Sequence, residues 1–383
     1  MKTSSKNIAI LIDSLAGGGA ERVMLTLAQT FIRQGHECCI LVLDDVREHD
    51  LPREIPIYAV PLRTGYEKLF PSKAIASLLA TLSQSIGSFD LHISNLEKTN
   101  LAVAKLNLPR TLYVIHNSVK HTLKPRWWQP FKWWMTRQSI RSLTGKSVVA
   151  VSQGVKDGIV GSALLNPQKL TTIYNPLALS ETSTLADALD DEIPQEPYLI
   201  HVGRVAKQKR HDVLFEALAK VKKPIKLVCL CRNVNKARKL AEKYGVEDRV
   251  ILPGFKQNPY PWIKQAKALV LSSDFEGFAM VLVEALSLGV GVISSDCDYG
   301  PREILTGPLA KWLVETGDSS ALAEKINNYV DEPPEYYHPE ILSEVQNDKA
   351  ASRYLELAER VFAPEGSTVQ VADSRKPSRL VTP

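Results

Sequence analysis

The stretch ALVLSSDFEGFAMVLVEALSLGVG, residues 268–291, decides the fold. Residues 269–271 form a short apolar run, which predicts a buried strand leading into a polar loop. Residues 279–288 are helix formers that are apolar on almost every side, and Gly289 ends the run. Because a helix that is apolar all round is normally buried, the stretch predicts a buried strand, a loop and a buried helix.

A carboxylate lies inside this helix at Glu284, where burial is costly unless the charge is hydrogen-bonded. The start of the helix leaves free backbone N–H groups near Phe278, Ala279 and Met280, which favour a phosphate. Glu284 lies roughly 6 Å further along the axis, where the ribose of a nucleoside diphosphate would fall. Glu276, in the loop, would face a sugar beyond the phosphates. The stretch therefore predicts a cradle for a nucleotide sugar.

The two glutamates, the seven residues between them and the FEGFA string resemble the signature of retaining glycosyltransferases of the GT-B type. The nearest match is family 4, which builds lipopolysaccharide, capsule and other glycans. The resemblance implies an α/β fold of two Rossmann-like, doubly wound domains that face each other across a cleft. Gly277 fits the signature, whereas Ala279 replaces the usual glycine, so we expect a slightly tighter approach to the donor. The alternative is that Glu284 only neutralises a buried Arg or Lys.

Bulk composition is that of a two-domain globular protein. The chain has 383 residues, of which 44% are apolar and 23% are charged, and this excludes wholesale disorder. Its five cysteines are an odd number without framework spacing, which favours a reducing cytosol. The start MKTSSKNIAILID lacks the pattern of a signal peptide, and no apolar run approaches the ~18 residues of a membrane span. We expect a cytoplasmic protein that does not cross a membrane and contacts one only at its surface.

A strand, a glycine loop, a helix and a second strand follow one another within residues 7–43, as in the first βαβ unit of a doubly wound domain. By the resemblance, Gly18 and Gly19 contact the sugar and phosphate of the donor. Glu21 and Arg22 are equally well explained as charges on an exposed first turn.

His116 follows a strand predicted over residues 111–115 and would lie at the carboxyl edge of the sheet, where α/β domains bind ligands. In the family, a His at this point lies against the donor sugar. Capping or packing is the common alternative for a single His after a strand.

Tryptophans and basic residues alternate in KHTLKPRWWQPFKWWMTRQSIRSLTGK, residues 120–146, and no acidic residue occurs between Glu97 and Asp157. Indoles beside cations suit the interface of an anionic membrane. Inward packing is the second interpretation, and binding of single-stranded nucleic acid is the third. Membrane contact is favoured because acceptors of such transferases are often lipid-linked. The proposed membrane or acceptor surface comprises Trp127, Trp128, Lys132, Trp133, Trp134 and Arg137.

Arg204 and Lys209 follow a strand predicted over residues 198–202 and match the family's GR…K pattern. In the family this pair neutralises the donor diphosphate. Fixed cations are needed there because the leaving nucleoside diphosphate gains charge as the sugar bond breaks. Ordinary surface basicity is the alternative, since Lys207 and Arg210 are adjacent.

Two further strings carry the resemblance. Gly254 and Phe255 form a turn that resembles the wall around the nucleotide base. DCDYGPREIL resembles the family's CPxGPxEIL block, with Asp298 in place of proline, and we interpret Arg302 and Glu303 as scaffold.

The predicted domains are residues 1–178 for the acceptor, a linker over 179–197, and 198–362 for the donor. The last helix, predicted over residues 339–362, packs back on the first domain in the family. Residues 363–383 are polar and patternless, which predicts a disordered tail.

The resemblance implies transfer of a hexose or N-acetylhexosamine from a nucleotide-diphosphate sugar, with UDP the family's usual nucleotide, to a glycan or lipid-linked acceptor with retained configuration. The catalytic candidates are Arg204, Lys209, Glu276 and His116. We expect no cofactor and no metal, because no Asp-x-Asp pair lies at a strand end to hold one. Asp190 and Asp191 lie in the linker, and Asp296 and Asp298 follow the donor helix. A sugar-nucleotide epimerase on the same fold is the first alternative, and a nucleic-acid-binding protein is the second.

Overall fold

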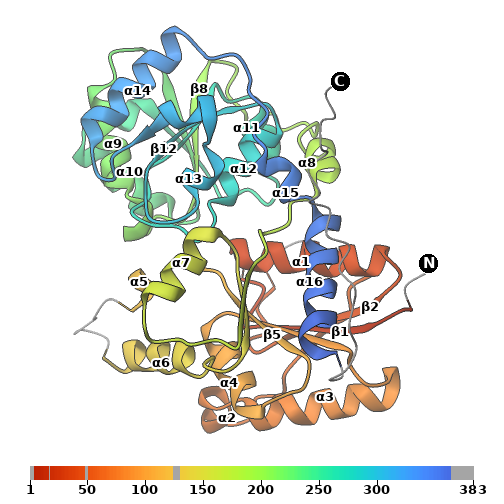
Figure 1. The fold of residues 1–383 in the computed structure, drawn as a ribbon. Coiled ribbons are helices and arrows are strands. Elements are labelled where there is room, and N and C mark those ends of the chain that lie inside the picture. The colour runs from red at the N-terminus through yellow and green to blue at the C-terminus, as the bar shows by residue number, and fades with distance from the viewer. Residues whose placement is uncertain (1–3, 17, 48–50, 124–129, 364–383) are drawn as a thin grey trace, which may run out of the picture.

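The computed structural model describes residues 4–16, 18–47, 51–123 and 130–363. These residues form two wholly parallel sheets with helices packed around each (Figure 1). Strand order is β3-β2-β1-β4-β5-β6-β7 in the first sheet and β10-β9-β8-β11-β12-β13 in the second. In both sheets the order reverses beside the first strand, as in doubly wound folds. The predicted pair of α/β domains is confirmed.

The first sheet lies in the predicted acceptor domain, for which we keep that name, and contains short strands separated by helices. Its strands are β1 (Asn7–Ile12), β2 (Glu37–Val42), β3 (Ile57–Ala59), β4 (Leu91–Asn95), β5 (Thr111–Ile115), β6 (Ser147–Ala150) and β7 (Lys169–Thr172). Its helices are α1 (Gly19–Arg33), α2 (Gly65–Leu69), α3 (Ser72–Ile86), α4 (Glu97–Leu106), α5 (Val119–Thr122), α6 (Pro130–Arg141) and α7 (Gln153–Gly161).

The second sheet lies in the predicted donor domain, for which we keep that name, and repeats this alternation. Its strands are β8 (Tyr198–Val202), β9 (Lys226–Leu230), β10 (Val250–Gly254), β11 (Ala268–Leu271), β12 (Gly291–Ser295) and β13 (Leu313–Val314). Its α-helices are α9 (His211–Lys220), α10 (Val234–Lys243), α11 (Tyr260–Lys264), α12 (Met280–Ser287), α13 (Pro301–Ile304), α14 (Ser319–Asp331) and α15 (Ile341–Glu344). Residues 268–291 include β11, the loop after it and α12, and Gly289 ends the helix with a φ of +76°.

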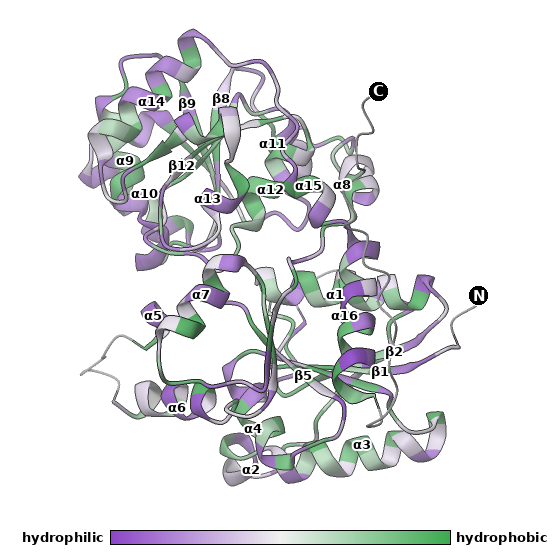
Figure 2. Ribbon diagram, viewed as in Figure 1, coloured by the Kyte–Doolittle hydropathy of each residue, from purple (hydrophilic) through white to green (hydrophobic). Residues whose placement is uncertain are grey.

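Apolar residues concentrate in the strands of both sheets and on the helix faces that cover them (Figure 2). Continuous apolar strands are expected where helices cover both faces of a parallel sheet. All five cysteines are buried and free. Among the described residues, no helix combines the length and the hydropathy that a bilayer crossing requires.

Two connections differ from the sequence prediction. Residues 179–197 lack a sustained apolar period, yet they include the helix α8 (Leu179–Leu185). The single helix expected over residues 339–362 is instead two, α15 and α16 (Asn347–Phe362). That prediction is wrong because the chain between the two helices pairs with another segment, where the N–H of Leu177 donates to the carbonyl of Val345 at 2.7 Å.

The helix α16 lies against α1 on the first sheet (Figure 1). Asn347 Nδ2 donates to Thr30 Oγ1 at 3.1 Å, and Lys6 Nζ lies 3.1 Å from a carboxylate oxygen of Glu359. The last described helix therefore returns to the first sheet.

Candidate functional site

Two neighbouring loops of the donor domain are fastened to each other at the carboxyl edge of its sheet. One follows β8 and the other follows β11, and these strands are adjacent in the sheet. Gln208 accepts from the N–H of Asp274 at 2.8 Å and donates through its side chain to the carbonyl of Phe275 at 2.7 Å. The hydroxyl of Ser272 donates to the carbonyl of Lys209 at 2.8 Å. The GR…K loop and the FEGFA loop thus form one unit.

Lys209 and Glu276 meet inside this unit. Their Nζ and Oε1 atoms lie 2.8 Å apart, and their side chains are only 18% and 10% exposed. Arg204 is exposed, and within the described ranges its side chain has no ion pair or hydrogen bond. Arg210 pairs with Asp274 at 2.7 Å, so this neighbouring cation holds the loop. Of the two cations predicted to bind the diphosphate, Lys209 is therefore engaged and Arg204 is open.

Glu284 lies in α12 and is buried, as the sequence predicts. No side chain caps the start of this helix. The cation nearest to Glu284 comes from the other domain, where Arg22 Nη1 lies 3.9 Å from Oε1. Burial raises the pKa of Glu284, while the charges of Arg22 and then Lys209 oppose that rise. The carboxylate therefore has charge compensation without a hydrogen bond among the described residues.

The FEGFA loop also lies against the acceptor domain. A Cβ added to Gly277 would lie 1.7 Å from the carbonyl oxygen of His116, so only glycine fits here. Ser152 Oγ donates to the carbonyl of Gly277 at 2.7 Å. Ala279, which replaces the family's glycine, has φ −50° and is buried without a left-handed backbone. Glycine is thus required at position 277 and not at 279.

His116 presents one ring nitrogen with a fixed role. Asn95 donates through Nδ2 to the carbonyls of Leu11 and Ile93, so its Oδ1 faces Nε2 of His116 at 3.0 Å. An amide oxygen only accepts, so Nε2 carries the proton and Nδ1 is an acceptor. Nδ1 is buried and has no partner among the described residues. Burial lowers the pKa of His116 to about 4, so the ring is neutral near pH 7.

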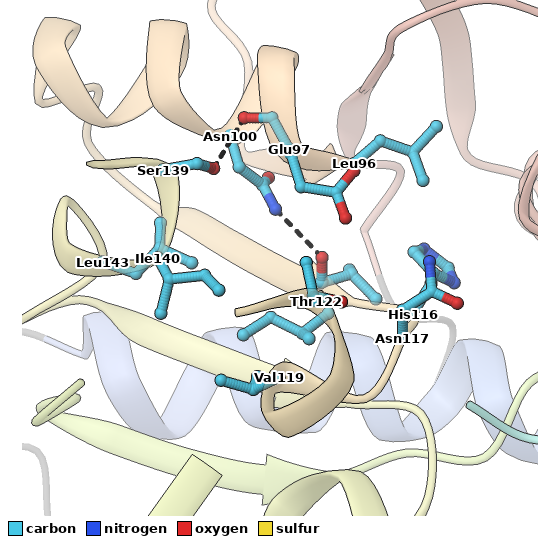
Figure 3. Close-up of a pocket in the computed structure, with 12 residues that line it drawn as sticks. Leu96, Glu97, Asn100, His116, Asn117, Val119, Thr122, Ser139, Ile140 and Leu143 are labelled. Carbon is cyan, nitrogen blue, oxygen red and sulfur yellow. Dashed lines mark hydrogen bonds between the residues drawn. The ribbon is translucent and has the colours of Figure 1, made fainter. Parts of the chain in front are cut away.

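A pocket of the acceptor domain opens beside His116 (Figure 3). Figure 3 shows His116 and Asn117 on one side, and on the other Ser139 and Ile140 of α6 with Leu143 just after it. Two hydrogen bonds brace its wall, from Asn100 Nδ2 to the carbonyl of Val114 at 3.0 Å and from Ser139 Oγ to the carbonyl of Glu97 at 2.6 Å. The predicted His therefore lies between this pocket and the donor loop.

In the described part of the chain, the remaining residues predicted to contact the donor are not bonded to Lys209, Glu276 or His116. Gly18 is the N-cap of α1, and a Cβ there would lie 2.2 Å from a carboxylate oxygen of Glu21. Gly19 is the first residue of the helix. Gly254 has a φ of +95°, and the half-exposed ring of Phe255 lies 4.1 Å from the guanidinium of Arg232. Their roles toward a donor stay predictions.

Sequence reasoning missed the part of Glu303 in joining the domains. Its carboxylate accepts from the backbone N–H groups of Gln153 at 2.8 Å and Gly154 at 2.7 Å, at the start of α7. It also accepts from the hydroxyl of Tyr174 at 3.1 Å, and Tyr299 packs directly on Gly154. The DCDYGPREIL string predicts a scaffold role for Glu303, but it gives no sign that Glu303 joins the two domains.

The expectation that no Asp-x-Asp pair lies at a strand end is wrong, because Asp296 and Asp298 directly follow β12. Asp298, where the family has proline, bonds across the domains. Its Oδ2 lies 2.9 Å from Lys120 Nζ and 3.0 Å from His121 Nε2. The ring of His121 stacks on Phe275 with centroids 4.4 Å apart. The substitution thus adds polar contacts between the donor loop region and α5.

The tryptophan-rich segment divides into inward and outward residues. Trp133 donates its indole N–H to the carbonyl of Leu123 at 3.0 Å, and Arg137 lies over its ring at 5.6 Å. Trp134 and Phe131 are 48% and 59% exposed. Trp127, Trp128 and the side chain of Lys132 lie outside the described residues. Packing therefore explains Trp133, whereas Trp134 is open to a partner.

Comparison with known proteins identifies the family. The model for glycosyl transferases group 1 matches residues 190–342, and the model for Glycosyltransferase Family 4 matches residues 17–181. The chain is a GT-B glycosyltransferase of family 4. The predicted family and enzyme class are confirmed.

Named relatives of this glycosyltransferase act in bacterial glycan synthesis. It is 26% identical over 349 residues to the N-acetylgalactosamine-N,N'-diacetylbacillosaminyl-diphospho-undecaprenol 4-alpha-N-acetylgalactosaminyltransferase of Campylobacter jejuni, covering 85% of this chain and 91% of the relative. It is 30% identical over 192 residues to the lipopolysaccharide 1,6-galactosyltransferase of Escherichia coli K12, a match that spans 48% of this chain and 52% of that enzyme. The solved structure of Anabaena Alr3699/HepE with UDP and glucose superposes with a TM-score of 0.66 at 18% identity, covering 93% and 98% of the two chains.

Proposed function

We propose that this glycosyltransferase moves a hexose or N-acetylhexosamine from a UDP-sugar to a glycan or lipid-linked acceptor, with retained anomeric configuration. The observation that carries the proposal is the convergence of Lys209, Glu276, Glu284 and His116 on the uncapped start of α12. Carboxylates that accept from hydroxyls, beside a cation and a positively polarised helix start, suit a sugar diphosphate. The UDP-bound structural neighbour supports this choice of nucleotide.

Arg204 and Lys209 are the proposed partners of the diphosphate. Arg204 is exposed and open, so its guanidinium is able to bind phosphate oxygens bidentately. Lys209 lies 2.8 Å from Glu276 and would share its charge between that carboxylate and a phosphate. We propose that these cations stabilise the leaving group without a metal, so turnover persists in EDTA.

Glu276 and His116 are proposed to hold the sugar. The carboxylate of Glu276, which lies 2.8 Å from Lys209 Nζ, would accept hydrogen bonds from sugar hydroxyls. Nδ1 of His116 is a buried acceptor without a partner among the described residues, so a sugar hydroxyl would satisfy it. Both groups would thereby orient the anomeric carbon toward the acceptor-side pocket.

Retention is proposed to follow from attack on the face that the diphosphate leaves. The bond from the anomeric carbon to the phosphate oxygen breaks, and its electron pair stays on the diphosphate. The acceptor hydroxyl forms the new bond on the same face, and its proton passes to a phosphate oxygen. In this scheme Glu276 binds hydroxyls and forms no covalent intermediate.

We propose a cytoplasmic enzyme that is peripheral on an anionic membrane. The Campylobacter relative acts on a diphospho-undecaprenol substrate and the Escherichia relative on lipopolysaccharide, according to their names. Exposed Trp134 and Phe131 on α6, in a segment rich in Lys and Arg, suit a lipid interface.

A donor panel tests the proposal. Thermal shifts with UDP-, GDP-, ADP- and TDP-sugars should single out a UDP-sugar, and release of UDP should depend on lipid-linked acceptor extract, with and without EDTA. NMR of the product should show the donor's anomeric configuration. Stabilisation by no sugar nucleotide, or an inverted product, would contradict the proposal. Release of UDP that ignores the acceptor would support the epimerase instead.

A further inference from the structure

Arg22 reaches from the acceptor domain into the donor domain. It lies in the first turns of α1, and its Nη2 donates to the carbonyl of Gln257 at 2.8 Å. Its Nη1 lies 3.4 Å from the hydroxyl of Tyr260, and the guanidinium lies 5.5 Å from the centre of that ring. The same Nη1 is 3.9 Å from Glu284 Oε1. One side chain thus contacts a loop, α11 and α12 of the other domain.

These contacts are too specific for a charge on an exposed turn. Gln257 and Tyr260 hold the guanidinium by a hydrogen bond and by a cation–π contact, and both residues belong to the donor domain. The third leaves a gap, since 3.9 Å allows electrostatic attraction but exceeds hydrogen-bond length. Arg22 therefore faces Glu284 without occupying the acceptor positions of its carboxylate.

The gap suits a vicinal diol. An ionised carboxylate accepts from two hydroxyls at once, whereas a protonated one has an O–H donor of its own. Glu284 is buried, which favours the protonated form, and Arg22 is the first of the two cations that oppose this effect. Fixing Arg22 beside Glu284 therefore keeps the carboxylate ready for ribose hydroxyls.

We infer that Arg22 is a positioning residue that prepares Glu284 for the donor's ribose, and that it does so only when the two domains meet. The inference rests on the proposed nucleotide-sugar donor. It assigns ribose recognition to both domains, because Glu284 belongs to one and the side chain that keeps it ready belongs to the other. The two domains must then come together for the 2′- and 3′-hydroxyls of the ribose to be recognised.

Calorimetry with UDP and 2′-deoxyUDP, and with GDP and 2′-deoxyGDP, tests this on the full chain. Wild type should prefer the ribonucleotide by about tenfold, as expected for loss of one hydrogen bond to a charged group. Arg22→Gln should reduce that preference to within about twofold while changing 2′-deoxy affinity little. Arg22→Lys should restore part of it. Arg33→Gln, at the far end of α1, is the matched control and should behave as wild type.

A pH series separates preparation of Glu284 from simple tethering. In Arg22→Gln the ribonucleotide preference should rise again with pH, because the carboxylate then ionises without its cation. Equal weakening of ribo- and deoxyribonucleotides at every pH would mean that Arg22 only tethers the domains, and the inference would be wrong. An unchanged preference in Arg22→Gln, with the preference lost in Glu284→Gln, would also overturn it and leave the proposed function standing. Failure of wild type to bind either ribonucleotide would overturn both.

Discussion

Glu276 and Glu284 belong to one loop and one helix, yet their partners come from different domains. Glu276 is hydrogen-bonded to Lys209 within the donor domain at 2.8 Å. Glu284 faces Arg22 of the acceptor domain at 3.9 Å, without a hydrogen bond among the described residues. Apart from His116, the sugar-facing half of the proposed site, which is the pair of Lys209 and Glu276, is therefore held within one domain, and the ribose-facing half requires both.

This difference has a consequence for how the enzyme would bind its donor. The two loops that carry Lys209 and Glu276 are fastened together by Gln208 and Ser272, so this half is preorganised. The other half depends on domain contacts such as those of Glu303 with the start of α7. Changes in the first half should affect chemistry most, and changes in the second should affect binding.

The largest effect should come from Arg204→Ala. We expect kcat to fall by about 10²- to 10³-fold, because an open cation that would meet the leaving diphosphate is lost. Lys207→Ala is the matched control, since Lys207 is an exposed cation of the same loop. Steady-state kinetics with saturating donor measures both. Equal losses in the two variants would remove Arg204 from the site.

Replacing Glu276 and replacing Glu284 should affect the binding of different ligands. Glu284→Gln should weaken UDP and UDP-sugar equally, by roughly 10- to 100-fold, because a charged acceptor of hydrogen bonds is lost. Glu276→Gln should leave UDP affinity nearly unchanged and weaken only the UDP-sugar, since its proposed partner is the sugar. Calorimetry with both ligands measures this. Identical profiles for the two variants would abolish the division between a sugar half and a ribose half.

Acidification should destabilise the donor domain, which contains the preorganised half. Under its first loop, His201 and His211 pack edge to face with ring centroids 4.6 Å apart. Burial lowers their pKa values to about 4 and about 2, below the ordinary 6.5. As pH falls, the unfolded chain therefore takes up protons on these residues before the folded chain does. Below about pH 6.5, each His lowers the free energy of unfolding by up to about 1.4 kcal/mol per pH unit.

Replacement of His211 checks this pH dependence. Neither of its ring nitrogens has a partner among the described residues, so His211→Phe removes no hydrogen bond seen there. Urea unfolding at pH 7, 6 and 5 should show a shallower loss of stability in His211→Phe than in wild type. Parallel pH curves for the two proteins would show that His211 is not neutral in the folded state.

The smallest effect concerns the membrane surface outside both halves. Trp134→Ser and Phe131→Ser should each reduce sedimentation with anionic liposomes by about threefold, because each removes an exposed aromatic side chain. Leu189→Ser is the control, since Leu189 is exposed elsewhere in the chain. Undiminished sedimentation of both aromatic variants would remove α6 from the proposed membrane contact.

Much of the fold could be predicted because apolar runs and glycines report local structure. The strand, loop and helix around Glu276 followed from such runs, and Gly289 ended the helix where expected. The break between α15 and α16 could not be predicted, because it depends on Leu177, which is distant in the chain. Likewise, α8 lacks the sustained apolar period by which a helix is recognised.

The site was predictable only within each domain. Lys209 and Glu276 lie in strings that resemble the family's motifs, and the structure brings them together. Contacts between the domains carry no such signal. The sequence explains Arg22 equally well as a surface charge and predicts a scaffold role for Glu303, because no local pattern shows which residues of another domain will face them.

A crystal soaked with a UDP-sugar tests the central claim most directly. The account predicts the diphosphate at the start of α12 and on Arg204, the ribose hydroxyls on Glu284 beside Arg22, and the sugar between Glu276 and His116. A donor bound elsewhere, or a bound donor with Glu276 and Glu284 engaged only by Lys209 and Arg22, would contradict it.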